Sequence, residues 1–184
     1  ISGFDNEFFQ ISDAESRLID PKQRLILMTA YRAFEDAGIL DELSNTSTGV
    51  FIGNSNMLNY KYFDIIKTIR PDLVDISGTG NMDSMLSSRI SYYFNLKGPS
   101  VVIDTACSSS LFAVDQAINS ISCGECDLAL VGGAHILIYP ENVDVSLGIE
   151  SKDERTRTFD DSANGTGVGE AVRAVVIKRL NDAI

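Results

Sequence analysis

The feature that most constrains the fold is a buried strand that passes almost directly into a helix around Cys107. Residues 101–103 form the β-branched run Val-Val-Ile, which is typical of a buried strand. Small residues follow at 104–110, and apolar residues then recur at helical spacing from Leu111 to Ile121. Segments of these two kinds alternate along the chain, which predicts an α/β fold with a sheet covered by helices on both faces.

Cys107 lies between the end of the expected strand and the start of the expected helix. Unpaired backbone N–H groups and a partial positive charge at a helix N-terminus stabilise an anion, and the thiolate is the nucleophilic form of cysteine. A strand, a tight turn, a nucleophile and a helix also make up the nucleophile elbow of hydrolases, although its Gly-x-Ser-x-Gly motif is absent here. A buried structural cysteine is the alternative, and the immediate neighbours of Cys107 leave both interpretations open.

The other elements follow from periodicity, caps and turn residues. Asp20 and Pro21 suit the start of a helix, and Gly38 suits its end. The expected helices cover residues 21–37, 60–69, 81–94 and 107–121, and the expected strands cover 48–52, 100–104, 127–132 and 172–178. Residues 139–170 are rich in turn formers and carboxylates.

Charge and cysteine content exclude several functions. The chain of 184 residues has 15 Lys and Arg against 26 Asp and Glu, and its net charge of −11 would repel a nucleic acid. No apolar run approaches the ~18 residues that a membrane span needs. The three cysteines, without a secretory signal, indicate free thiols in a reducing compartment, so we expect a cytoplasmic protein.

A metal or redox site is not favoured at the Cys-x-x-Cys pair of Cys123 and Cys126. The pair follows a predicted helix, whereas reactive pairs of this kind open one. A zinc site would also lack ligands, because His135 is the only histidine. His135 precedes an apolar run, which is typical of a structural residue, and we leave it out of the site. We expect no metal and no bound cofactor.

Three other motifs are explained without a separate site. The glycine-rich residues 165–169 precede a strand, which does not fit a dinucleotide fingerprint. The carboxylates of Asp153, Glu154, Asp160 and Asp161 lack the spacing of a calcium loop and suit a solvated surface. Residues 108–110 are serines without the partners of a serine triad, and we expect them to cap the helix and tighten the turn.

Residues 104–111, with the sequence DTACSSSL, resemble the active-site signature of β-ketoacyl synthases, in the form carried by modular polyketide synthases. The resemblance extends over most of the chain, to residues 20–24, 35–39, 49–53, 80–92, 98–100, 124–134, 157–160 and 169–170. It implies a thiolase-like layered fold (α-β-α-β-α) and makes Cys107 the catalytic nucleophile. It also implies that the glycine-rich residues 165–169 belong to a loop that borders the active site.

The chain also departs from the family pattern. The family uses two further histidines, one of them in a His-Gly-Thr-Gly-Thr stretch, and neither has a counterpart here. The family's opening strand is absent too, and Ala171 stands where a glycine usually follows Gly-Glu. We therefore expect residues 1–184 to be a partial ketosynthase domain, the N-terminal half without the first strand and without the C-terminal half.

The resemblance implies acyl transfer to Cys107, followed by decarboxylative Claisen condensation with a malonyl-type extender, in polyketide or fatty acid biosynthesis. Substrates would arrive on the phosphopantetheine of an acyl carrier protein. The other implied partners are further modules of a polyketide synthase and a second copy of the complete enzyme. Without the two histidines, we expect this chain alone to be inactive in condensation. Another thiolase-superfamily acyltransferase and a non-condensing domain that only holds chains remain alternatives.

Overall fold

The computed structural model describes residues 3–55, 62–138 and 148–184. Its sheet has the strand order β2-β1-β3-β4. The strands are β1 (Thr48–Gly53), β2 (Ser100–Ile103), β3 (Leu128–His135) and β4 (Ala171–Lys178). The first three are mutually parallel, and β4 pairs with β3 in the antiparallel direction. The carboxyl ends of β1, β2 and β3 therefore meet at one edge of the sheet.

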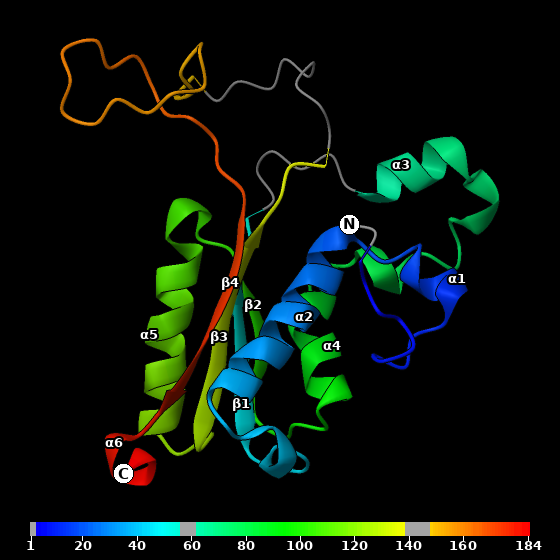
Figure 1. Ribbon diagram of the computed structural model, residues 1–184, viewed down its shortest axis with the longest axis vertical. Helices are drawn as coiled ribbons and strands as arrows, with labels where there is room; N and C mark the ends of the chain where they lie inside the picture. Colours follow the sequence, from blue (N-terminus) through cyan, green and yellow to red (C-terminus); the bar gives the residue numbers. More distant parts are fainter. Residues whose placement is uncertain (1–2, 56–61, 139–147) are drawn as a thin grey trace.

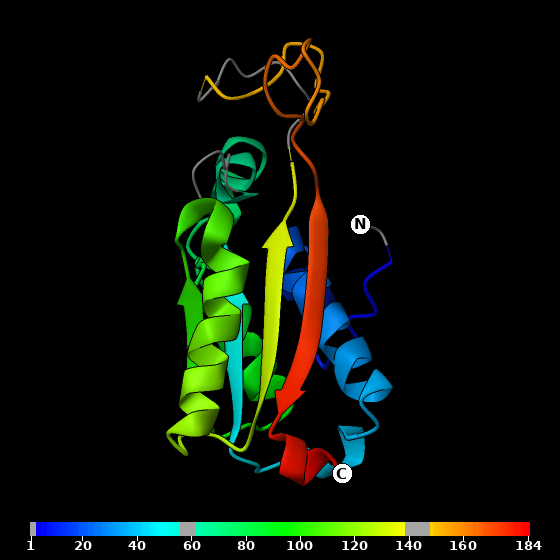
Figure 2. The ribbon, with the colours of Figure 1, turned by 90° about the vertical axis from the view of Figure 1, so that its left-hand side faces the viewer.

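Helices cover both faces of this sheet, as the sequence predicts (Figures 1 and 2). The longer ones are α2 (Pro21–Asp36), α4 (Met85–Tyr93) and α5 (Ser109–Ser122), and the shorter ones are α1 (Asp13–Ser16), α3 (Tyr62–Ile69) and α6 (Leu180–Ala183). Helices α2 and α4 pack on one face, and α5 packs on the other. The described part of the chain thus forms three layers.

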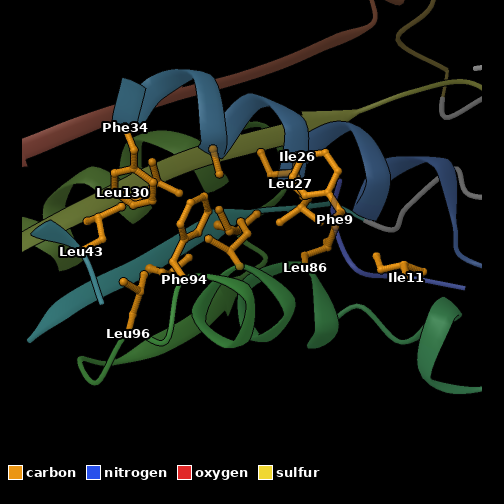
Figure 3. Packing of buried hydrophobic residues seen from close by; sticks show 14 of the residues in the cluster. Phe9, Ile11, Ile26, Leu27, Phe34, Leu43, Leu86, Phe94, Leu96 and Leu130 are labelled. Atoms are coloured by element: carbon orange, nitrogen blue, oxygen red, sulfur yellow. The ribbon is translucent and has the colours of Figure 1, made fainter. Parts of the chain in front are cut away.

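The larger core lies between the sheet and the pair α2 and α4 (Figure 3). Phe34 of α2 is fully buried and its ring meets Phe94 edge to face, with the ring centroids 5.0 Å apart. Ile52 and Leu130 come from the two central strands and complete this cluster. Side chains of a strand alternate between faces, so the even-numbered residues of β1 and β3 point to this side.

A smaller core lies between the sheet and α5. Phe51 and Val131 of the central strands meet Ala113 and Ala117 of the helix, which are fully buried. The two small alanines let α5 lie close to the sheet. Leu111, the first of the apolar residues at helical spacing in the sequence, is instead 77% exposed.

The predicted helix boundaries hold best where a cap defines them. Asp20 caps α2 by accepting a 2.7 Å hydrogen bond from the Lys22 N–H, and Gly38 follows the helix with a φ of +69°. The helix expected from residue 81 begins only at Met85. The reason is that the Asn81 side-chain amide donates to the carbonyl oxygens of Leu18 and Ser77, which holds residues 79–81 in a separate 3₁₀ turn.

Strand β3 extends three residues further than expected, to His135, because its ladder with β4 continues to the pair of His135 with Ala171. The first two residues of the expected helix 60–69 lie outside the described residues. Within the described ranges, none of the helices combines the length and apolarity needed to cross a membrane.

Candidate active site

Cys107 lies in a short turn between β2 and α5. The strand ends at Ile103, residues Ala106–Ser108 form a 3₁₀ turn, and α5 begins at Ser109. The residue is exposed. The helix thus starts two residues after the nucleophile candidate, which agrees with the expected strand–turn–helix arrangement.

Ser109 holds this turn together. Its side chain is buried and its hydroxyl donates to the Ala106 carbonyl oxygen at 2.7 Å, while the Thr105 N–H donates to the same hydroxyl oxygen at 2.9 Å. Asp104 adds a third bond by accepting from the Ala106 N–H at 3.0 Å. The expectation that the serines tighten the turn is confirmed. The expectation that they cap α5 is wrong, because the Ser108 hydroxyl bonds back to the Thr105 carbonyl instead.

The turn also contains a strained residue. Ala106 has a φ of +55°, in the left-handed region where an L-residue costs about 1–2 kcal/mol. Strain of this kind persists only where the surroundings hold it, and here the three hydrogen bonds around Thr105 and Ala106 do so. The backbone reverses sharply just before Cys107, as it does at a nucleophile elbow.

Two paired glycines hold the N-terminus of α5 close to the sheet. Gly53 of β1 is the register partner of Gly133 of β3. A Cβ atom on Gly53 would lie 2.6 Å from the Ser110 nitrogen, and one on Gly133 would collide with the Ser110 hydroxyl. Only glycine allows such an approach. This pair was not among the residues predicted from the sequence, although a glycine follows the apolar residues of each of these two strands.

A cavity of about 560 Å³ opens beside Cys107 at the carboxyl end of the parallel strands. Most of its wall is small or apolar, with contributions from Val114, Val131, Ala134, Ile149, Val168 and Val175. A pocket of this size and lining suits an acyl chain. His135, which the sequence analysis left out of the site, also lines this cavity.

The loop between residues 148 and 170 closes part of the cavity. Thr166 and Val168 line it, which confirms that the glycine-rich stretch borders the site of Cys107. The backbone of Thr166 bridges to Glu150. The preceding residue, Gly165, has a φ of +137° that favours glycine, and it lies against the backbone of Glu150 and Ser151. The loop therefore has a defined geometry at this point.

The acidic residues of the same loop form a solvated surface, as expected. Asp153, Glu154, Asp160 and Asp161 are exposed. Hydrogen bonds from Arg157 and Ser151 hold the pKa of Asp153 well below its ordinary value. Among residues 3–55, 62–138 and 148–184, no three His, Cys, Asp or Glu side chains gather in a way that could hold a metal ion.

The remaining two cysteines differ in their surroundings. Cys123 is exposed at the end of α5, whereas Cys126 is buried and its thiol contacts the Ser120 hydroxyl at 3.5 Å. Cys107 is therefore the cysteine that the structure associates with the cavity.

Comparison with known proteins assigns the family. The family described as "Beta-ketoacyl synthase, N-terminal domain" matches residues 1–183. The chain belongs to the β-ketoacyl synthase family. It is 41% identical to the highly reducing polyketide synthase srdA of Neurospora crassa and 42% identical to the non-reducing polyketide synthase olcA of Penicillium canescens. Both alignments cover 100% of this chain and 8% of the relative, so this chain spans less than a tenth of the length of these proteins.

Solved ketosynthase structures show the same fold. The ketosynthase from module 6 of the bacillaene synthase of Bacillus subtilis 168 matches with a TM-score of 0.83 and 38% identity over 98% of this chain and 30% of that chain. Ketosynthase twelve of the bacillaene polyketide synthase of Bacillus amyloliquefaciens matches with a TM-score of 0.84 and 33% identity, over 98% and 32% of the two chains. The thiolase-like fold implied by the signature is therefore confirmed.

Proposed function

We propose that Cys107 is the nucleophile of a polyketide-synthase ketosynthase. The observation that carries the proposal is the position of Cys107, exposed in a strained turn beside an acyl-sized cavity, in a chain of the β-ketoacyl synthase family. In the proposed first step, the Cys107 thiolate attacks the carbonyl carbon of an acyl-pantetheine thioester. The new C–S bond forms as the pantetheine thiolate leaves and takes up a proton, so the acyl group remains on Cys107.

The turn offers one group to stabilise the oxyanion of this step. Among the described residues, the Cys107 N–H donates no hydrogen bond, so it is free to bind the oxygen that becomes negative. Removing one such donor typically costs about 2.7–4 kcal/mol of transition-state stabilisation. The N-terminus of α5 adds a favourable partial charge next to the same atoms.

The second step is proposed from the family alone. A malonyl-type extender loses CO₂, and the resulting enolate attacks the Cys107 thioester, which forms a carbon–carbon bond and frees the thiolate. The family uses two histidines here, and the chain's only histidine, His135, matches neither. We therefore propose that residues 1–184 are a partial ketosynthase domain that supplies the nucleophile and does not condense by itself.

The same proposal names the partners. The polyketide synthase relatives support an acyl carrier protein that delivers substrates on phosphopantetheine, together with other polyketide-synthase modules. We further propose a cytoplasmic homodimer for the complete enzyme, with no bound cofactor. The polyketide synthase relatives favour a ketosynthase over another thiolase-superfamily acyltransferase.

Acylation of a single cysteine tests the first step. We would incubate the protein with butyryl N-acetylcysteamine thioester and map the acyl adduct by mass spectrometry. We expect the adduct on Cys107, its loss in Cys107→Ala, and no change in Cys123→Ala, which removes the other exposed thiol. Equal acylation of Cys107→Ala and the wild type would refute the proposal.

A second assay tests the proposal that this chain is acylated on Cys107 but does not catalyse condensation. We would supply the 184-residue chain with one carrier protein loaded with an acyl group and another loaded with a malonyl group, and look for the condensed product. We expect an acyl adduct on Cys107 and no β-ketoacyl product. Formation of that product would show that the chain needs neither family histidine.

A further inference from the structure

His135 points to the same side of the sheet as α5. Side chains alternate along a strand, and Ala129 and Val131 of β3 both pack in the core beneath α5. The ladder of β3 with β4 runs without a bulge from Leu128 to His135, so the alternation is preserved. Gly133 and His135 therefore continue the row that faces α5.

His135 and Cys107 both lie close to the contact between Gly133 of β3 and Ser110 of α5, and on the same side of it. Gly133 abuts Ser110 in the first turn of α5, and His135 lies two strand residues further on, about 6.6–6.8 Å. Cys107 precedes Ser110 by three residues, which run from the 3₁₀ turn into the first turn of α5 and span about 5 Å. Helix α5 runs antiparallel to β3 (Figure 2), so both displacements point toward the carboxyl ends of the strands. Both residues line the cavity there.

The imidazole of His135 has no partner of its own in the part of the chain that the structure describes. Among residues 3–55, 62–138 and 148–184, no side chain forms a hydrogen bond or ion pair with it, and the residue is partly exposed at the cavity. Arg173, opposite Gly133 on β4, lies on the same face, but its guanidinium donates to the Val172 carbonyl at 2.9 Å. Imidazole can donate and accept hydrogen bonds, and it stands here in a largely apolar wall.

We propose that His135 contacts the acyl chain carried by Cys107 and selects chains with a hydroxyl or carbonyl oxygen close to the thioester. This inference rests on the proposed acylation of Cys107. Few polar groups in an apolar pocket fix the orientation of a ligand and set its specificity. A saturated chain would cover the imidazole of His135 without forming a hydrogen bond to it, whereas an oxygen atom on the chain would form one. One such hydrogen bond corresponds to a preference of about tenfold.

A pair of substrates that differ by one hydroxyl tests the proposal. We would measure initial rates of Cys107 acylation by 3-hydroxybutyryl and butyryl N-acetylcysteamine thioesters, using the mapped mass shift. We expect the wild type to prefer the hydroxylated thioester by about tenfold. His135→Leu should bring the ratio of rates close to one, and His135→Asn, which keeps a hydrogen-bonding group, should restore part of the preference.

Two controls keep the outcomes distinct. Alkylation of Cys107 by iodoacetamide, followed in each variant together with the urea midpoint, reports an intact turn independently of acyl recognition. A wild-type ratio near one, or an unchanged ratio in both His135→Leu and His135→Asn, overturns this inference while leaving acylation of Cys107 in place. Failure of both thioesters to modify Cys107 overturns the proposed function and this inference with it.

Discussion

The close contact between Gly53 and the first turn of α5 provides the sharpest test of how the fold positions the nucleophile. In Gly53→Ala the added Cβ atom would lie 2.6 Å from the Ser110 nitrogen, 2.7 Å from the Ser109 carbonyl carbon and 2.8 Å from the Ser110 Cα. Comfortable contact between carbon atoms begins near 3.5 Å, so the first turn of α5 has to retreat by about 1 Å. All three atoms belong to the backbone, and no side-chain rotation can relieve the collision.

The displacement has two measurable consequences. Overpacking of a core typically costs about 1–3 kcal/mol, which we expect as a lower free energy of unfolding in urea. A misplacement of about 1 Å at a catalytic group can slow a reaction roughly 100-fold. We therefore expect acylation of Cys107 in Gly53→Ala to slow by up to two orders of magnitude under conditions where the variant is folded.

Gly78 offers a matched control. Its φ of −55° and ψ of −56° are helical, and a Cβ atom there would meet nothing within 4 Å. Gly78→Ala should change the free energy of unfolding by no more than about 0.5 kcal/mol and leave the acylation rate close to that of the wild type. A Gly53→Ala variant with wild-type stability and rate would refute the reasoning. Lost stability with an unchanged rate would show that the strain does not reach Cys107.

Two further substitutions test the turn and a buried cap. Ser109→Ala removes both hydrogen bonds of a buried hydroxyl and leaves the Thr105 N–H unpaired. This substitution should lower the free energy of unfolding in urea by about 1–3 kcal/mol and slow the acylation of Cys107. Ser122→Ala, at the far end of α5, is the control and should change neither quantity. Burial raises the pKa of Asp20 above 3.8, so ionisation of this carboxyl opposes folding, and stability should fall as the pH rises from 3.8 through the raised pKa. Asp20→Asn keeps a good helix cap, so it should flatten that part of the stability profile without lowering the free energy of unfolding at pH 7. Asp20→Ala removes the cap and should lower that free energy by about 1 kcal/mol. A steeper pH profile in Asp20→Asn would contradict the raised pKa of Asp20.

The sequence predicts those parts of the fold that local chemistry determines. The strands follow from short apolar runs, of which β2 is β-branched, and the start of α2 follows from the cap at Asp20. The position of Cys107 follows in the same way, because strand, turn and helix are consecutive in the chain.

Features that depend on distant contacts could not be predicted in this way. The start of α4 is shifted because Asn81 bonds to Leu18, 63 residues away. The pairing of Gly53 with Gly133 and the placement of His135 at the cavity depend on strand register, which periodicity within one segment does not contain. These tertiary features complete the surroundings of Cys107.

The left-handed backbone at Ala106 limits what evolution or design can place before the nucleophile. Branched side chains are strongly disfavoured in that conformation, while glycine adopts it freely. The position of the Cys107 backbone is thus set by the course of the main chain through Ala106. Engineering that aims to change which acyl groups this site accepts has more freedom in the opposite wall of the cavity than in the turn that carries the sulfur.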